Sequence, residues 1–224
     1  MSSTTVPATT VHLVRHGEVH NPEGILYGRL PGYRLSARGE AMAQRLAEHF
    51  TSPADDGAPR DVALVVASPL ERAQQTATPV AEALGLELGA DPRLLEAENY
   101  FQGMTFGVGD GSLRHVRHWP RLWNPWRPSW GEAYRAQVAR MMAAVHDARA
   151  QAEGREAVLV SHQLPIWVTR LAAEKRPFIH DPRKRECSLA SVTSLHFAGD
   201  RLERVSYAEP AKDLLPGATQ VPGA

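Results

Sequence analysis

The chain has 224 residues and a mass of 24.6 kDa, enough for one domain with a substantial hydrophobic core. Lys+Arg and Asp+Glu both number 25, and this zero formal charge argues against a protein that mainly holds duplex nucleic acid. Cys187 is the single cysteine, which excludes a disulfide framework. The start of the chain does not resemble a secretion signal, which predicts a cytoplasmic protein. No apolar run is long enough to predict a membrane span.

The pattern along the chain alternates between short apolar strands and helix-length segments. It predicts strands at 11–14, 61–67, 86–88, 157–160, 189–197 and 202–207. It predicts helices at 37–50, capped by Ser36, at 69–84, at 131–152 and at 164–173. Pro69 is expected in the first turn of its helix, and Pro79 is expected to kink or split that helix.

This alternation indicates an α/β fold, a three-layer sandwich with a mainly parallel central sheet and helices on both faces. The hairpin signal at Gly199 and Asp200 predicts an antiparallel edge. We expect a single domain over 11–209, between a disordered N-terminal tail at 1–10 and a flexible C-terminal tail at 210–224.

Three of the predicted strands are followed by arginines and histidines, residue types that can bind and attack phosphate. Arg15 and His16 follow the first strand, Arg72 lies soon after the second, and His162 follows the fourth. The carboxyl ends of parallel strands meet at one edge of a sheet, where ligands bind. Guanidinium groups hold oxyanions, and a neutral imidazole attacks phosphorus. We therefore expect an anion-binding catalytic site there, with Gly17 letting the backbone approach the ligand.

These segments also resemble a known family. LVRHGEV at 13–19, SPLERAQQTA at 68–77 and LVSHQLP at 159–165 are similar to the signature segments of the histidine phosphatase superfamily, which includes the phosphoglycerate mutases. The stretch LYGRLPGYRLSARGEAMAQRLA at 26–47 resembles a fourth family segment. The resemblance covers roughly residues 10–200 in order.

The resemblance implies a role for each matching residue. His16 would be the nucleophile, Arg15 and Arg72 would bind the phosphate, and His162 would complete the pocket. Gln163 stands where the family usually has glycine, and its amide is a candidate phosphate ligand. Asn21 is another, although it falls five places after the nucleophile instead of the family's six. No metal or cofactor is expected.

The leaving group needs a proton, which a carboxyl group with a raised pKa can supply. The family places a glutamate shortly after a leucine, between the second and third signatures. Glu96 follows Leu95 at the matching place in DPRLLEAENYFQG. We therefore take Glu96 as the proton donor and Glu98 as the second choice.

An insert at about 97–130 interrupts the α/β pattern with tryptophans and arginines. Three interpretations are open: a cap packed on the core, a substrate lid, and a surface for single-stranded nucleic acid. The lid would use Arg114, Arg117, Arg121 and Trp123. A second basic run at 181–186 is flanked by acids and is expected to be a solvated loop.

Together these features predict a phosphomonoester hydrolase that forms a phosphohistidine intermediate on a small anionic phosphorylated metabolite. The alternatives are phosphoryl transfer of the phosphoglycerate mutase type and a non-catalytic protein that binds a phosphorylated ligand. No nucleic acid or membrane partner is expected. The identity of the substrate and the oligomeric state do not follow from the sequence.

Overall fold

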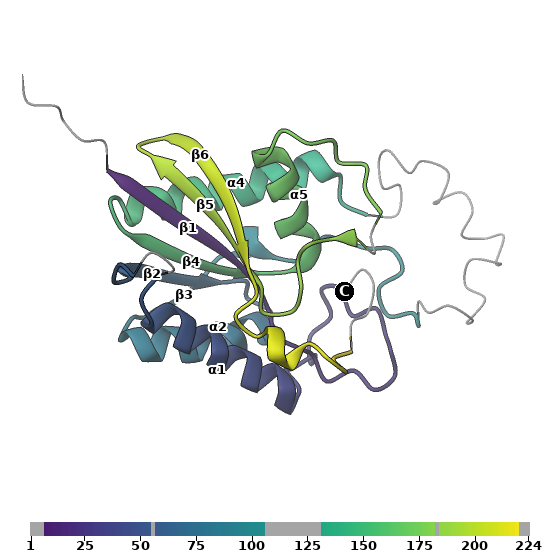
Figure 1. Cartoon of the computed structure of the whole chain (residues 1–224). Helices are drawn as coiled ribbons and strands as arrows, with labels where there is room; N and C mark the ends of the chain where they lie inside the picture. Colours follow the sequence, from purple (N-terminus) through teal and green to yellow (C-terminus); the bar gives the residue numbers. More distant parts are fainter. Residues whose placement is uncertain (1–6, 55–56, 106–130, 182–183, 220–224) are drawn as a thin grey trace, which may run out of the picture.

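The computed structural model describes residues 7–54, 57–105, 131–181 and 184–219, and they form a helix-covered sheet (Figure 1). Six strands pair in the order β3-β2-β4-β1-β5-β6. The strands are β1 (Ala8–Arg15), β2 (Val62–Ala67), β3 (Leu88–Ala90), β4 (Glu156–Ser161), β5 (Val192–Ala198) and β6 (Arg201–Ala208). β3, β2, β4 and β1 are mutually parallel, whereas β5 is antiparallel to β1 and to β6. The predicted mainly parallel sheet with an antiparallel edge is confirmed.

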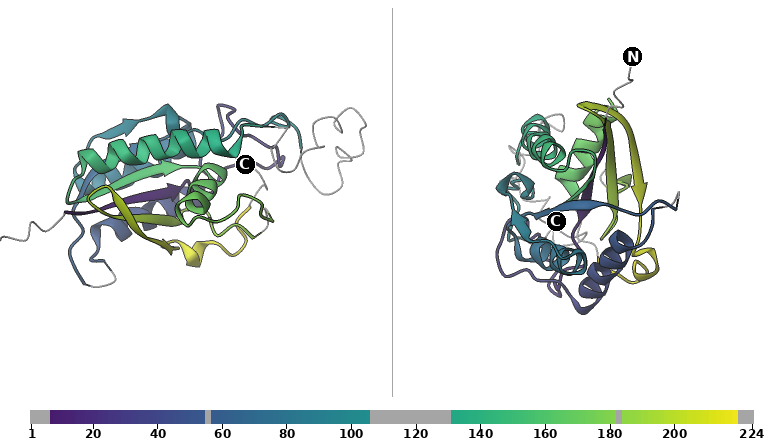
Figure 2. Two further views of the ribbon diagram at one scale, coloured as in Figure 1. Left: turned by 90° about the horizontal axis from the view of Figure 1, so that it is seen from above. Right: turned by 90° about the vertical axis from the view of Figure 1, so that its left-hand side faces the viewer.

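Two pairs of helices cover the sheet, one pair on each face (Figure 2). They are α1 (Ala37–Thr51) and α2 (Glu71–Leu84) on one face, and α4 (Tyr134–Gln151) and α5 (Gln163–Ala173) on the other. Each face of the sheet has its own hydrophobic core, and neighbouring residues of β1 pack into different cores. Val14 packs in the cluster under α1 and α2, and Leu13 packs in the cluster under α4 and α5. This alternation follows from the period of two in a strand. The predicted three-layer sandwich is confirmed.

The helix boundaries follow the sequence signals in α1 and depart from them in α2. Ser36 caps α1, because its side chain accepts a hydrogen bond from the backbone N–H of Gly39. α2 begins at Glu71, so Pro69 lies ahead of the helix and not in its first turn. Pro79 does not split α2, which continues to Leu84.

Both ends of the domain extend past their predicted boundaries. β1 begins at Ala8, inside the predicted N-terminal tail. Part of the predicted flexible C-terminal tail is ordered against the domain: Ala211 is buried, a 3-10 turn, η5 (Lys212–Leu214), follows it, and the N–H of Thr219 bonds to Glu18. Within the described ranges, no helix has both the length and the apolar character needed to cross a bilayer.

Candidate functional site

The ends of β1, β2 and β4 meet at one edge of the sheet. We call the candidate site at this edge the catalytic rim, and its buried residues are Arg15, His16, Ser68, Arg72, Glu96 and His162. The first residue after β1 and the first residue after β2 each add one more backbone hydrogen bond to the pairing with β4. The N–H of His16 donates to the Ser161 carbonyl at 3.2 Å, and the N–H of Ser68 donates to the Val160 carbonyl at 2.8 Å. The parallel topology therefore brings together residues that are more than 140 positions apart in the sequence.

His16 is oriented with one ring nitrogen bonded and the other free. Nδ1 lies 2.8 Å from the Gly17 carbonyl, so Nδ1 carries the proton and donates. Nε2 is buried and has no hydrogen-bond partner. Burial, together with the charges of Arg72 and Arg15, lowers the pKa of His16 well below its ordinary value. The ring is therefore neutral at pH 7, with a lone pair available on Nε2.

Two buried guanidinium groups lie at the rim, and both keep N–H groups without a partner. The Arg15 side chain is 1% exposed and donates from Nη1 to the Cys187 carbonyl at 2.7 Å. Arg72 donates from Nη2 to the Gly28 carbonyl at 2.5 Å. Neither forms an ion pair with any described residue, and the Nε atoms of both and Nη1 of Arg72 are unpartnered. Buried cations with free donors form a site for an anion.

His162 adds a further buried nitrogen without a hydrogen-bond partner to those of Arg15, His16 and Arg72. Its ring lies 5.1 Å from the ring of His16, centroid to centroid. Nε2 is 2.8 Å from the Ser68 hydroxyl, and Nδ1 is buried without a partner. Burial, with Arg72 and His16 nearby, lowers the pKa of His162 well below its ordinary value. Within the described residues, no group of three or more His, Cys, Asp or Glu side chains is arranged to hold a metal ion.

The structure separates the two candidate proton donors. Glu96 is buried, and its Oε1 accepts a hydrogen bond from the N–H of Ala97 at 2.7 Å. Burial raises the pKa of Glu96 above its ordinary value, although the Ala97 bond, Arg72 and Arg15 oppose the rise. The side chain of Glu98 is 70% exposed and pairs with Arg29 at 2.9 Å. Only Glu96 therefore combines burial with a position close to the rim arginines.

Close backbone packing holds the loop that follows β1. A Cβ added to Gly39 would lie 2.0 Å from the Glu18 carbonyl oxygen, and one added to Gly17 would lie 2.6 Å from the Gly39 carbonyl oxygen. The close approach that Gly17 permits here is to the start of α1, and its approach to a ligand stays a prediction. The Glu18 carboxylate accepts hydrogen bonds from the Ser36 hydroxyl at 2.5 Å and from the N–H of Thr219 at 2.7 Å.

The other predicted phosphate ligands are occupied by protein partners. Both ends of the Asn21 amide bond to the backbone of Ile25, at 2.8 and 3.1 Å. Gln163 is the first residue of α5, and its amide lies 3.4 Å from the Cys187 carbonyl and 3.3 Å from Nη1 of Arg185. Neither amide is therefore free in the way that the rim guanidinium groups are.

Arg185 is a site residue that the sequence analysis missed. The run at 181–186 was expected to be a solvated loop, yet Arg185 is partly buried, and its charge acts on Glu96 and Arg15. Its Nε lies 2.9 Å from Nε2 of His180. Acidic residues flank Arg185 in the sequence, so the run has the composition of a solvated loop. Local composition does not show that the loop lies close to a distant strand end.

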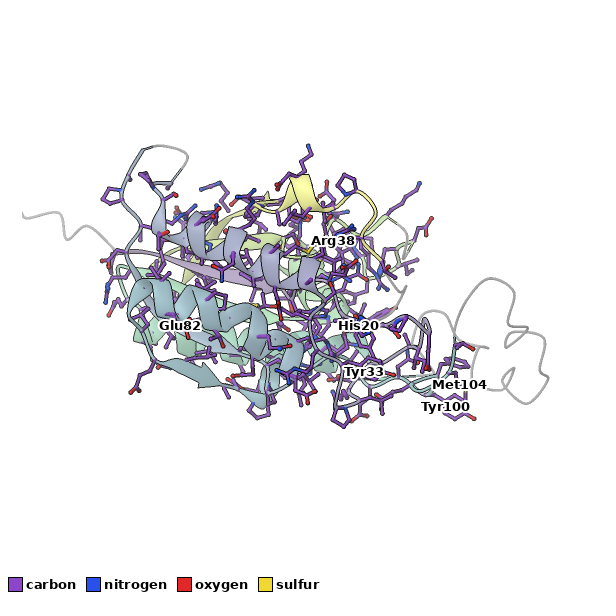
Figure 3. The ribbon with its side chains drawn as sticks, turned by 90° about the horizontal axis from the view of Figure 1, so that it is seen from below. His20, Tyr33, Arg38, Glu82, Tyr100 and Met104 are labelled. Atoms are coloured by element: carbon purple, nitrogen blue, oxygen red, sulfur yellow. The ribbon has the colours of Figure 1, made fainter. Side chains whose placement is uncertain are left out.

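The described start of the insert lies at the catalytic end of the molecule. Figure 3 labels Tyr100 and Met104 at the same end as His20 and Tyr33. The N–H of Leu26 donates to the Met104 carbonyl at 2.9 Å, and the two sides of the insert meet where Glu132 N–H bonds to the Glu98 carbonyl at 3.1 Å. The predicted lid residues Arg114, Arg117, Arg121 and Trp123 lie outside the described residues.

Comparison with known proteins identifies the family of the chain. The family model of the histidine phosphatase superfamily (branch 1) matches residues 11–210. An uncharacterized protein of Mycobacterium tuberculosis is 53% identical over 203 residues, covering 91% of this chain and 97% of that protein. A probable phosphoglycerate mutase of Enterobacter sp. is 30% identical over 168 residues, which cover 70% of each protein. A solved mycobacterial glucosyl-3-phosphoglycerate phosphatase has a TM-score of 0.67 and 27% identity, covering 89% of this chain and 97% of that chain.

Proposed function

The chain belongs to the histidine phosphatase superfamily, and we propose that it hydrolyses a small anionic phosphomonoester through a phosphohistidine on His16. One observation carries the proposal. A neutral imidazole with a free Nε2 lies beside two buried guanidinium groups that form no ion pair with a described residue. A phosphoryl group would supply both the missing anion and the atom that Nε2 attacks.

In the proposed complex the phosphate oxygens accept hydrogen bonds from Arg15 Nε and from Nε and Nη1 of Arg72, the donors that lack partners. His162 adds a fourth donor from Nδ1. Because its pKa is lowered, His162 is neutral and carries one proton. The Ser68 hydroxyl then donates to Nε2, which keeps the proton of the ring on Nδ1, facing the phosphate.

The first chemical step transfers the phosphoryl group to the protein. Nε2 of His16 attacks phosphorus, the ester P–O bond breaks, and Glu96 gives its proton to the leaving oxygen. The Gly17 carbonyl accepts a hydrogen bond from Nδ1–H and so stabilises the positive charge that the ring acquires. The raised pKa of Glu96 supports this role, since the carboxyl group keeps its proton closer to neutral pH.

The second step releases phosphate. The Glu96 carboxylate takes a proton from water, the water oxygen attacks phosphorus, and the N–P bond breaks. His16 and Glu96 return to their starting protonation states. This cycle needs no metal ion, so activity is expected to survive a chelator. A mutase would use the same residues and pass the phosphoryl group to a second acceptor. Mutases of this family tend to have a longer segment between the donor and the second histidine than the one from Glu96 to His162, which favours the hydrolase.

Arg185 supports the proposal that the substrate carries a second anionic group. Phosphate binding employs Arg15 and Arg72, and Arg185 forms no ion pair with a described residue. It is a third guanidinium close to the rim, beside the donor Glu96. We expect Arg185→Gln to lower kcat/KM for a carboxylated phosphomonoester such as phosphoserine by roughly tenfold and to leave p-nitrophenyl phosphate nearly unaffected.

The reaction class is tested with p-nitrophenyl phosphate, with and without a chelator, in the wild type, His16→Ala and the control His20→Ala. His20 is an exposed histidine four residues from the nucleophile. We expect chelator-resistant activity that is lost only in His16→Ala. Full activity of a folded His16→Ala protein would refute the mechanism.

Acid-labile, base-stable phosphate trapped on the protein identifies the intermediate. We expect it in the wild type during turnover of phosphoserine and expect none in His16→Ala. Phosphate binding without a trapped intermediate would favour the non-catalytic alternative. Transfer to a second phosphorylated metabolite, with no release of inorganic phosphate, would favour the mutase.

A further inference from the structure

The guanidinium group of Arg185 is held on two of its edges and is open on the third. Nε donates to Nε2 of His180 at 2.9 Å, and Nη1 donates to Oε1 of Gln163 at 3.3 Å. Nη2 forms no hydrogen bond with a described residue, and the side chain forms no ion pair with one. A partly buried cation with a fixed orientation and one open edge is preorganised for an anion that binds at that edge.

Gln163 links Arg185 to the part of the rim proposed to bind phosphate. Its Nε2 donates to the Cys187 carbonyl at 3.4 Å, and Nη1 of Arg15 donates to the same carbonyl at 2.7 Å. The reversed amide would point N–H groups at a guanidinium and its oxygen at a carbonyl, so the contacts fix the orientation of the amide. Gln163 is the first residue of α5 and directly follows His162, so its backbone is fixed next to the rim. A glycine, the residue that the family usually has here, has no side chain with which to reach Arg185.

His180 supports the other edge of the guanidinium group. Its Nδ1 lies 2.6 Å from the Phe178 carbonyl, so Nδ1 carries the proton and Nε2 offers its lone pair to Arg185. Burial, together with the charge of Arg185, lowers the pKa of His180 below its ordinary value, and the ring is therefore neutral at pH 7. The rings of Tyr134, from α4, and Trp167, from α5, lie 6.1 and 5.8 Å from the His180 ring, centroid to centroid. Two helices therefore pack against the side chain that accepts the Arg185 hydrogen bond.

Arg185 lies beside Glu96, the proposed proton donor. The charge of Arg185 acts on Glu96 and opposes the rise in the pKa of that carboxyl group. In the proposed reaction Glu96 gives its proton to the leaving oxygen, so the alcohol part of the substrate lies on the side of Arg185. The phosphate is already bound by Arg15 and Arg72 in that complex. The anion at the open edge of Arg185 is therefore a group on the alcohol, and a carboxylate matches the planar geometry of a guanidinium.

We propose that Gln163 and His180 are positioning residues that hold Arg185 for a carboxylate on the alcohol part of the substrate. The inference rests on the proposed phosphatase function and adds the substrate class, which is alkyl phosphomonoesters with a carboxylate close to the ester oxygen. Gln163 then determines specificity through Arg185, without a contact of its own with the substrate.

Phosphoserine and phosphoethanolamine form a matched pair for the test, because they differ only in the carboxylate. The measured quantity is the ratio of kcat/KM for phosphoserine to kcat/KM for phosphoethanolamine. We expect a ratio of roughly ten or more in the wild type, a roughly tenfold fall in Arg185→Gln, and a roughly three- to tenfold fall in Gln163→Ala and in His180→Phe. Lys184→Gln is the control, because it removes a neighbouring exposed charge from the same loop and should keep the wild-type ratio. The far-UV circular dichroism of every variant checks the fold.

A double-mutant cycle separates positioning from a direct contact. If Gln163 acts through Arg185, Gln163→Ala should lower the ratio in the wild type and leave it unchanged in Arg185→Gln. The same holds for His180→Phe. A further fall of the ratio in the double variants would show that these residues act independently of Arg185, and it would overturn their positioning role.

Binding to the His16→Ala variant tests the same preference without turnover. We expect calorimetric titration to give a roughly tenfold lower Kd for phosphoserine than for phosphoethanolamine, and we expect Arg185→Gln in this background to remove the difference. A preference in binding, in a protein whose wild type releases no phosphate, would refute the proposed hydrolysis and support this inference. The absence of any preference for phosphoserine in the binding measurement would overturn this inference, even if the wild type hydrolyses both compounds.

Discussion

Thr76 connects the loop of the proposed nucleophile, His16, to the helix that carries Arg72. Its hydroxyl accepts a hydrogen bond from the N–H of Gly17 at 3.0 Å and donates to the Arg72 carbonyl at 2.7 Å. The Gly17 carbonyl in turn accepts from Nδ1 of His16. One buried hydroxyl therefore fixes the peptide that orients the ring of His16, the proposed nucleophile, relative to Arg72, the arginine proposed to bind phosphate. We regard Thr76 as a positioning residue, since no reacting atom contacts it.

The substitution Thr76→Val removes this hydroxyl and keeps the shape of the side chain. It leaves the buried N–H of Gly17 without a partner, which costs about 1–3 kcal/mol of unfolding free energy. A domain of this size loses about 2–4 °C in Tm for each kcal/mol, so we expect a drop of roughly 2–12 °C. Because the orienting peptide can then shift, we expect kcat to fall roughly ten- to hundredfold, with a smaller change in KM.

Urea denaturation and steady-state kinetics with p-nitrophenyl phosphate measure the two effects. Thr76→Ser retains the hydroxyl and should recover most of kcat. Thr78→Val is the matched control, because Thr78 is exposed on the same helix and its hydroxyl bonds only to the Gln74 carbonyl at 2.8 Å. If Thr76→Ser lost as much kcat as Thr76→Val, packing of the methyl group and not the hydrogen bonds would explain the effect, and this reasoning would be refuted.

Three further predictions concern the donor, the pH profile and the packing of the first loop. Glu96→Gln should slow alkyl phosphates by roughly 10²–10⁴-fold and p-nitrophenyl phosphate much less, because the nitrophenolate leaves without a proton; an equal loss on both would point to another donor. The wild-type rate should fall at alkaline pH as Glu96 loses its proton, above the ordinary carboxyl pKa, and at acid pH as His16 gains one, below the ordinary imidazole pKa. In Glu96→Gln the alkaline fall, measured in both proteins with an alkyl phosphate whose leaving group needs the proton, should disappear, and its persistence would contradict the assignment. Gly39→Ala should reduce the unfolding free energy by at least about 1–3 kcal/mol, since the new Cβ would lie 2.0 Å from the Glu18 carbonyl oxygen, and an unchanged denaturation midpoint would exclude this packing.

Local signals in the sequence were sufficient for the layers and for most of the rim. The apolar runs at 11–14, 61–67 and 157–160 have the length and composition of buried parallel strands, and the structure contains all three. Because parallel strands end at the same edge, identifying the strands also located Arg15, His16 and His162. Glu96 was selected through the family resemblance, and its burial separates it from Glu98.

Other features depend on partners that are distant in the sequence. Arg185 sits in a charged run that resembles any solvated loop, and only the fold brings it to Glu96. The C-terminal segment has the composition of a flexible tail, yet Thr219 bonds to Glu18, 201 residues away. The register of four strands places Glu156, Thr10, His196 and Arg204 in one row. The sequence by itself determined which strands form and what chemistry stands at their ends, because those are properties of neighbouring residues. The tertiary structure decided which charges lack a partner, because a counter-ion is defined by distance in space.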